Sequence, residues 1–252
     1  MFIPTLRLLA VSSALLVLAA CSTRSISDSG YKGEGSSYTA SAYAYKGELS
    51  PYDILGVDLD RPITEEDIAR AMAARKPIQV KKGSSIMLVQ SGAAIPDSDM
   101  VAALERSYSV ATFSGVPAFP AGADQKVVQT LPKDQYAKLF RLAAAKGGYE
   151  TIIVYWGLLE AGTQSGATKA VSWVPFVGAS IPDQFQTMRI RLNMAVIDTR
   201  TGQWETFAPS AFTDEALSSS RSRAASDQEQ VALLKKQAYD GAAEALARKY
   251  GG

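Results

Sequence analysis

The chain has 252 residues, of which 47% are hydrophobic, with 26 basic and 25 acidic side chains and no histidine. This apolar content is sufficient for a packed core, while the balanced charge gives no electrostatic footprint for nucleic acid. The lack of histidine removes the Ser-His and Cys-His pairs of nucleophilic enzymes and the imidazole ligands of most zinc and iron sites. We therefore expect no metal, no cofactor and no nucleic-acid partner.

The first twenty residues have the three parts of a bacterial export signal. Arg7 is the positive residue, an apolar run extends over Leu8–Leu18, and the small residues Ala19 and Ala20 precede Cys21. The run is shorter than the about 20 residues that a membrane-spanning helix requires. We therefore expect residues 1–20 to be a signal peptide that is cleaved rather than retained as a helix.

The sequence Leu18-Ala19-Ala20-Cys21 has the form of a lipobox, and Cys21 is the only cysteine of the chain. An unpaired thiol is unusual in a secreted protein because it is reactive or pairs between chains, and acylation removes this problem. We therefore predict a lipid on Cys21, with plain secretion or a retained anchor as the alternatives. Ser22 stands where Asp signals inner-membrane retention in Gram-negative lipoproteins. This favours the periplasmic face of the outer membrane over the outer face of the inner membrane.

Residues 21–50 are rich in Ser, Gly, Tyr and Ala, with almost no large aliphatic residue before Leu49. This composition is typical of a flexible tether. Four tyrosines leave a second interpretation open, a segment that lies on a partner or on the domain: Tyr31, Tyr38, Tyr43 and Tyr45. We expect the rest of the chain, 51–252, to form a single α/β domain.

Helices and strands are predicted to alternate through the first half of this domain. In chain order, the patterns predict a helix over 64–76, a strand over 85–90, a helix that starts at Asp97 or Ser98, a strand over 108–113, a helix over 132–147 and a strand over 151–156. The first of these helices is expected to turn four apolar residues toward the core: Ile68, Ala71, Met72 and Ala73. The helix over 132–147 is expected to present one apolar face: Tyr136, Leu139, Phe140 and Ala143.

The clearest alternation lies in the second half. Every second residue from Met188 to Val196 is apolar, and Arg189, Arg191 and Asn193 lie between them. With a turn at 198–202 and a return strand near 204–207, this pattern predicts an antiparallel hairpin at about 187–210. A capping box at 226–229 is expected to begin a long C-terminal helix. The predicted fold class is α/β, with a single mixed β-sheet covered by helices.

The long loop predicted over 160–186 contains the apolar stretch 170–178. Such a stretch either folds back on its own domain or docks a partner, a second copy or the membrane, since large exposed apolar patches mark such sites. Trp173, Pro175 and Phe176 are the candidate contact residues, because aromatic side chains dominate interface energetics. If this loop docks a partner, Trp173→Ala weakens an assembly without unfolding the domain.

Two segments resemble a superfamily of periplasm-facing lipoproteins. The stretch 144–157 resembles its helix–Gly–strand–Gly step, and 196–204 resembles its hairpin with Asp and Thr-Gly. The superfamily includes the curli-secretion channel lipoprotein, the lipoprotein activators of peptidoglycan synthases and the amino-terminal domain of the Tol translocation protein. The resemblance covers about 84–250 and implies a non-enzymatic α/β domain that binds proteins or assembles. Residues 51–82 and 160–186 have no counterpart, so no functional residue is carried over.

Together these observations predict a lipid-anchored envelope lipoprotein, not an enzyme, that acts through contacts with other envelope proteins or through self-association. The alternative is a periplasmic hydrolase built on carboxylate, Ser and Lys chemistry, or a purely structural envelope component. Ser29–Lys32 matches S-x-x-K but lies in the tether, and 162–169 lacks the spacing of a phosphate loop, so we expect no nucleotide.

Overall fold

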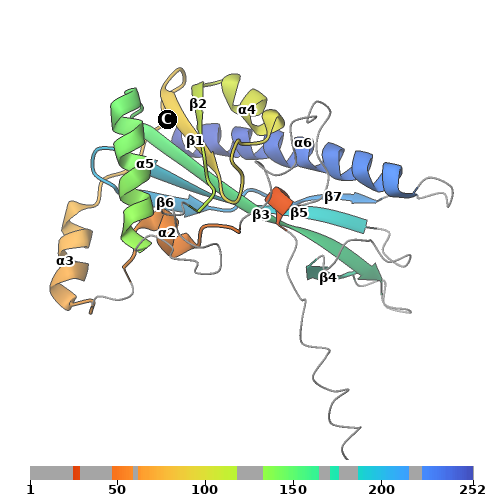
Figure 1. Ribbon diagram of the computed structural model, residues 1–252, viewed down its shortest axis with the longest axis horizontal. Coiled ribbons are helices and arrows are strands. Elements are labelled where there is room, and N and C mark those ends of the chain that lie inside the picture. Colours follow the sequence, from red (N-terminus) through yellow and green to blue (C-terminus); the bar gives the residue numbers. More distant parts are fainter. Residues whose placement is uncertain are drawn as a thin grey trace, which may run out of the picture.

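The computed structural model describes residues 25–28, 47–58, 62–117, 133–164, 171–175, 187–215 and 223–251. A single mixed β-sheet with helices packed on it confirms the predicted α/β class (Figure 1). The elements in chain order are η1 (Ile26–Asp28), α2 (Pro51–Leu55), α3 (Glu65–Ala74), β1 (Ser85–Gln90), α4 (Ser98–Glu105), β2 (Ser109–Phe113), α5 (Lys133–Gly147), β3 (Thr151–Gln164), β4 (Val171–Pro175), β5 (Thr187–Asp198), β6 (Trp204–Phe207), β7 (Phe212–Glu215) and α6 (Arg223–Tyr250).

The sheet is built around the long antiparallel pair β3 and β5. Its strand order is β2-β1-β3-β5-β6, with β4 on β3 and β7 on β5. One edge of β3 pairs in parallel with β1 over 151–155 and then with β4 over 160–164. The outer edge of β5 pairs with β7 over 187–190 and with β6 over 194–197, which confirms the predicted hairpin. Each half of the β3–β5 ribbon therefore has its own neighbours.

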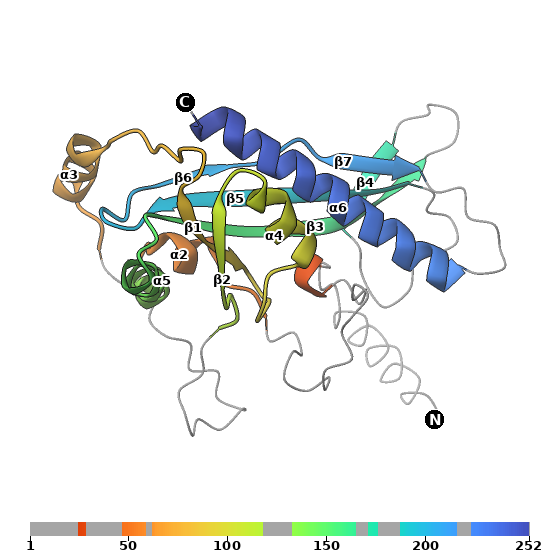
Figure 2. The same ribbon diagram turned by 90° about the horizontal axis from the view of Figure 1, so that it is seen from above.

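Helices cover both faces of the sheet (Figure 2). Helices α4 and α6 pack on one face, where the alternating side chains from Met188 to Val196 are buried as predicted. Helices α2 and α5 cover the other face, and their core includes Ala195 and Ile197 of β5. Both faces of β5 are therefore buried near its C-terminal end. Near its start, buried apolar residues on one face alternate with Arg189 and Arg191 on the other.

The turn of the hairpin is held by its own side chains. The Asp198 carboxylate accepts hydrogen bonds from the backbone N–H and the hydroxyl of Thr201, at 2.6 and 2.7 Å. Gly202 follows with φ of 75°, a backbone conformation that favours glycine. These contacts confirm the sequence-based interpretation of 198–202 as a turn.

Three expectations from the sequence are wrong. Helix α3 buries none of its residues, so Ile68, Ala71, Met72 and Ala73 do not reach the core. The range 160–186 is not one long loop, because β3 continues to Gln164 and β4 pairs with it. Helix α6 begins at Arg223, so the predicted capping box lies inside it; the two alanines after Arg223 favour helix and extend it.

The apolar face predicted for the helix over 132–147, which is α5, is mostly confirmed. Tyr136 and Phe140 are buried and Ala143 packs against the same core, but Leu139 is 37% exposed. Ala144, one turn after Phe140, is buried as well. In the part of the chain that the structure describes, no helix is both long enough and apolar enough to span a bilayer.

Candidate functional site

The residues singled out by the sequence lie largely outside the described ranges. Leu18, Ala19, Ala20 and Cys21 precede the first described residue, and Phe176 follows the last residue of β4. Trp173 and Pro175 are placed on β4 by their backbone pairing with Gly162 and Glu160, in the sheet rather than in a loop. The predicted contact through these three residues therefore stays a prediction.

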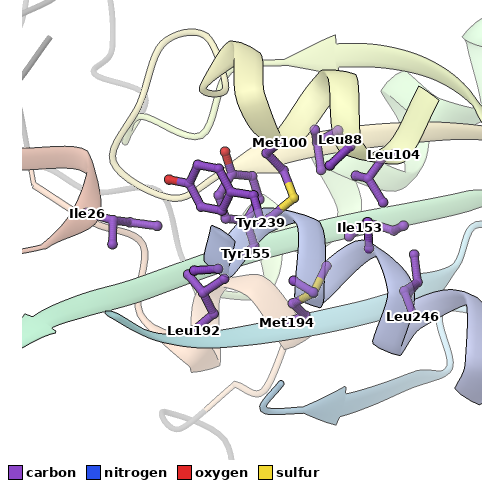
Figure 3. Packing of buried hydrophobic residues seen from close by; sticks show 14 of the residues in the cluster. Ile26, Leu88, Met100, Leu104, Ile153, Tyr155, Leu192, Met194, Tyr239 and Leu246 are labelled. Carbon is purple, nitrogen blue, oxygen red and sulfur yellow. The ribbon is translucent and has the colours of Figure 1, made fainter. Parts of the chain in front are cut away.

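The first described residues after Cys21 are docked on the domain. Ser25 forms a single antiparallel bridge with Leu158, on the edge of β3 between the end of β1 and the start of β4. Ile26 is 1% exposed and lies beside Gly157 of β3. Figure 3 shows Ile26 in the same cluster of core residues as Tyr155 and Leu192.

A second part of the predicted tether is docked beside the first. Leu49 is 5% exposed and belongs to the core on the opposite face of the sheet. Its backbone N–H donates to Ser91 Oγ at 2.9 Å, and the Ser25 hydroxyl donates to the Glu48 carboxylate. Ile26 and Leu49 are the only large aliphatic residues between Cys21 and Ser50, and both are buried.

Ser27 connects this segment to a buried polar network at the end of β1. Its hydroxyl donates to the Ser91 carbonyl at 2.6 Å and accepts a bond from Gln90 Nε2 at 3.0 Å. Gln90 Oε1 accepts from the Tyr155 hydroxyl at 2.5 Å and from the backbone N–H of Asp97 at 2.7 Å. The amide of Gln90, which is fully buried, is therefore satisfied on both sides.

Asp97 extends the network to α6. Its Oδ2 accepts from the Tyr239 hydroxyl at 2.6 Å and lies 3.0 Å from Lys235 Nζ. Asp97 is the N-cap residue of α4, yet its side chain makes these contacts instead of capping the helix. Through these hydrogen bonds the network connects the N-terminal segment with β1, β3, α4 and α6.

Burial favours the protonated form of the two tyrosine hydroxyls in this network, which donate hydrogen bonds to Gln90 and Asp97. Burial raises the pKa of both the Tyr155 and the Tyr239 hydroxyl well above the ordinary value of 10.0, and the Asp97 charge raises it further. Both hydroxyls are therefore protonated at neutral pH. The Asp97 carboxylate is held by Lys235 and Tyr239, and these contacts connect α6 to the network that holds the N-terminal segment.

A carboxylate that is more deeply buried than that of Asp97 lies on the far half of the β3–β5 ribbon. Glu160 is 3% exposed, and its two oxygens lie 2.6 Å from Arg189 Nε and 2.7 Å from Arg191 Nη2. The two arginines occupy the strand face predicted for them and neutralise the charge. No cluster of three or more metal-ligating side chains occurs within the described ranges.

Helix α3 lies at one end of the molecule (Figure 1), beside the turn between β5 and β6, and carries exposed apolar side chains. We define the α3 surface as Ile68, Ala71, Met72, Arg75 and Trp204. Ile68 is 45%, Met72 74% and Trp204 41% exposed. A hollow of about 410 Å³ separates the helix from β6, and all but Ile68 of these residues line it. Exposure of such side chains in one place is typical of an interaction surface.

Sequence reasoning missed both the network and this surface. A polar residue inside an apolar strand is the signal for the network, since Gln90 and Tyr155 must find partners when buried. The isolated aliphatic residues Ile26 and Leu49 are the signal for docking of the tether. The sequence of α3 shows an amphipathic pattern, but this pattern does not indicate what packs against the apolar face of the helix.

The chain matches the model of the YafT bacterial lipoprotein family over residues 50–249 and belongs to this family. It is therefore a membrane-anchored lipoprotein of the bacterial envelope. The lipoprotein GNA1162 of Neisseria meningitidis, a solved structure, is similar at 15% identity and a TM-score of 0.25, over 62% of this chain and 98% of that chain. A similarity this weak supports no argument about the position or role of any residue in this chain. A search of curated proteins gives no match. The resemblance to curli-secretion and peptidoglycan-synthase lipoproteins stays a prediction.

Proposed function

We propose that the protein is acylated on Cys21, faces the periplasm from the outer membrane and acts through protein–protein contacts rather than catalysis. Membership of a lipoprotein family and the lipobox before the only cysteine support the anchor. The two carboxylates described above, at Asp97 and Glu160, are paired with cations, which supports a binding role.

Docking of Ser25 makes the connection to the lipid short. Ser25 follows Cys21 by four positions, and a fully extended chain of this length spans at most about 14 Å. The domain is therefore held close to the bilayer by a fixed point on β3, not by a free segment ending at residue 50. A binding surface on such a domain meets partners that lie in or next to the membrane.

The α3 surface is the observation that carries the proposed protein contact. Ile68 and Met72 lie one turn apart on a helix whose ten residues are all outside the core. Large apolar side chains exposed together on a helix are more typical of helix recognition than of a solvent-facing segment. This assigns the contact to α3 in addition to the region of Trp173, where the sequence predicted it.

Site-specific photo-crosslinking in intact cells tests this function. A photoreactive residue at position 72 is expected to crosslink to protein in the envelope, since Met72 is central in the α3 surface. Position 142 is the matched control, because Leu142 of α5 is 55% exposed and lies outside this surface. Crosslinking to lipid alone at position 72, or equal protein crosslinking at 72 and 142, would contradict a protein contact through α3.

A further inference from the structure

We propose that the α3 surface binds the α3 surface of a second copy of this chain, as an antiparallel helix pair related by a two-fold axis. The inference rests on the proposed function, because it names the partner of the same surface. It depends on three properties of α3: its lack of support within the domain, its charge pattern and its small side chains.

Helix α3 has little support from the rest of the domain. A ten-residue helix is marginal in water unless an apolar face packs against something. Its first turn is closed by a capping box between Thr64 and Asp67. Its far end is held by Gln203, which accepts from the N–H of Lys76 at 3.0 Å and donates to the Ala74 carbonyl. Beside the hollow that separates α3 from β6, Ile68 and Met72 therefore remain 45% and 74% exposed.

The charges on α3 are arranged with opposite signs at its two ends. Glu65 and Glu66 lie in the first turn, and Arg75 and Lys76 follow the last. Two copies side by side in parallel would bring like charges together. Two antiparallel copies bring the acidic end of each against the basic end of the other, so the surface is complementary to itself.

One register satisfies the apolar and the charged contacts together. If Ile68 packs against Met72 of the second copy, then Glu65, three residues before Ile68, lies opposite Arg75, three residues after Met72. The two-fold axis repeats both contacts. Ala71 lies between them on the same stripe, and its small side chain allows the helices to approach closely.

Membrane anchoring favours a partner of this kind. A ten-residue contact is small compared with the interface of a stable soluble dimer. Lipid-anchored copies share one surface, and their confinement raises the effective concentration at which a weak contact forms. A self-complementary helix on an anchored protein therefore suffices for association at the membrane.

Cysteine crosslinking of the full-length protein in cells tests the pairing. Ala71→Cys is expected to give a disulfide-linked dimer on oxidation, because residue 71 is close to the two-fold axis. Ala73→Cys is the matched control, turned roughly 200° away around the helix axis. The wild-type chain shows whether Cys21 itself contributes. Equal dimer yields from the two variants would overturn the proposed pairing.

Charge reversal then identifies the orientation. In the Ala71→Cys background, Glu65→Arg alone or Arg75→Glu alone creates two repulsive contacts per pair and is expected to reduce the dimer about five-fold. Co-expression of the two variants with different tags restores attraction at both contacts, and the mixed dimer is expected at the yield of the unreversed chain. Failure of the mixture to recover would overturn the antiparallel arrangement.

The two experiments separate this inference from the proposed function. Crosslinking from position 72 to a different protein, with no dimer through position 71, overturns self-association and leaves the protein contact standing. Crosslinking from position 72 to no protein overturns both.

Discussion

Removal of the Ile26 side chain tests whether the docked segment sets the distance between domain and bilayer. Ile26→Ala deletes three carbon atoms from a side chain that is 1% exposed. At roughly 0.8 kcal/mol for each buried CH₂ group, with a further cost for the cavity, the loss is about 2–4 kcal/mol. Beyond Ile26 the segment is held by the Ser25 bridge and by hydrogen bonds of Ser27, so we expect it to detach.

Detachment moves the first fixed point of the chain from Ser25 to Leu49. The maximal span of four residues is about 14 Å, whereas a flexible chain of the residues from 21 to 49 has a root-mean-square length of about 30 Å. The domain therefore gains freedom to move away from the membrane. The fold is expected to persist, because Ile26 lies at the margin of a core formed mainly by the sheet, α4 and α6.

Energy transfer between the domain and the bilayer measures this change. The acylated protein carries one fluorophore on Lys82→Cys, since acylation blocks Cys21, and the liposomes contain a lipid dye. We expect lower transfer for Ile26→Ala than for wild type, and no change for Leu142→Ala, which alters an exposed side chain. Circular dichroism verifies that each variant is folded. Equal transfer in the Ile26→Ala variant and the wild type would refute the reasoning.

Further predictions concern the polar network and α3. Asp97→Ala leaves Lys235 and Tyr239 without their shared acceptor and is expected to reduce the free energy of unfolding by about 2–4 kcal/mol in urea titrations, whereas an unchanged midpoint would contradict the network. Because the folded-state pKa of Tyr239 is raised, its contribution to stability is complete below pH 10 and is lost as the pH rises further; Tyr239→Phe, although less stable near pH 8, should lose less stability between pH 8 and 11. Met72→Ser should change the unfolding free energy by less than about 0.5 kcal/mol, because Met72 is 74% exposed, yet reduce crosslinking from position 68.

The sequence predicts the elements of this fold better than the contacts among them. The alternation along β5 identifies its buried face because side chains on a strand have a period of two. The network residues could not be grouped in the same way, since 65 positions separate Gln90 from Tyr155, 138 separate Asp97 from Lys235 and no local pattern spans such intervals. Helix α3 shows the same limit, because its periodicity defines an apolar face but not the partner of that face.

The tether shows how composition can hide a docking site. Averaged over residues 21–50, the abundance of Ser, Gly and Tyr predicts a flexible chain. Two residues depart from that average, Ile26 and Leu49, and they are the ones that enter the two cores. A fully buried aliphatic side chain contributes about 1.5–3 kcal/mol, so one such residue can fix a short segment in place.

The short connection and the helix pair together constrain how two copies stand on the membrane. The two-fold axis of an antiparallel pair is perpendicular to the plane that contains both helices. The two lipid anchors, each with a connection of about 14 Å, lie at the same height when this axis follows the membrane normal, and this is the orientation that we expect. Helix α3 must then lie parallel to the bilayer, so fluorophores at Glu66 and Ala73, near its two ends, should show equal energy transfer to a lipid dye. Clearly unequal transfer would mean that the short connection and the proposed pair do not occur in the same assembly.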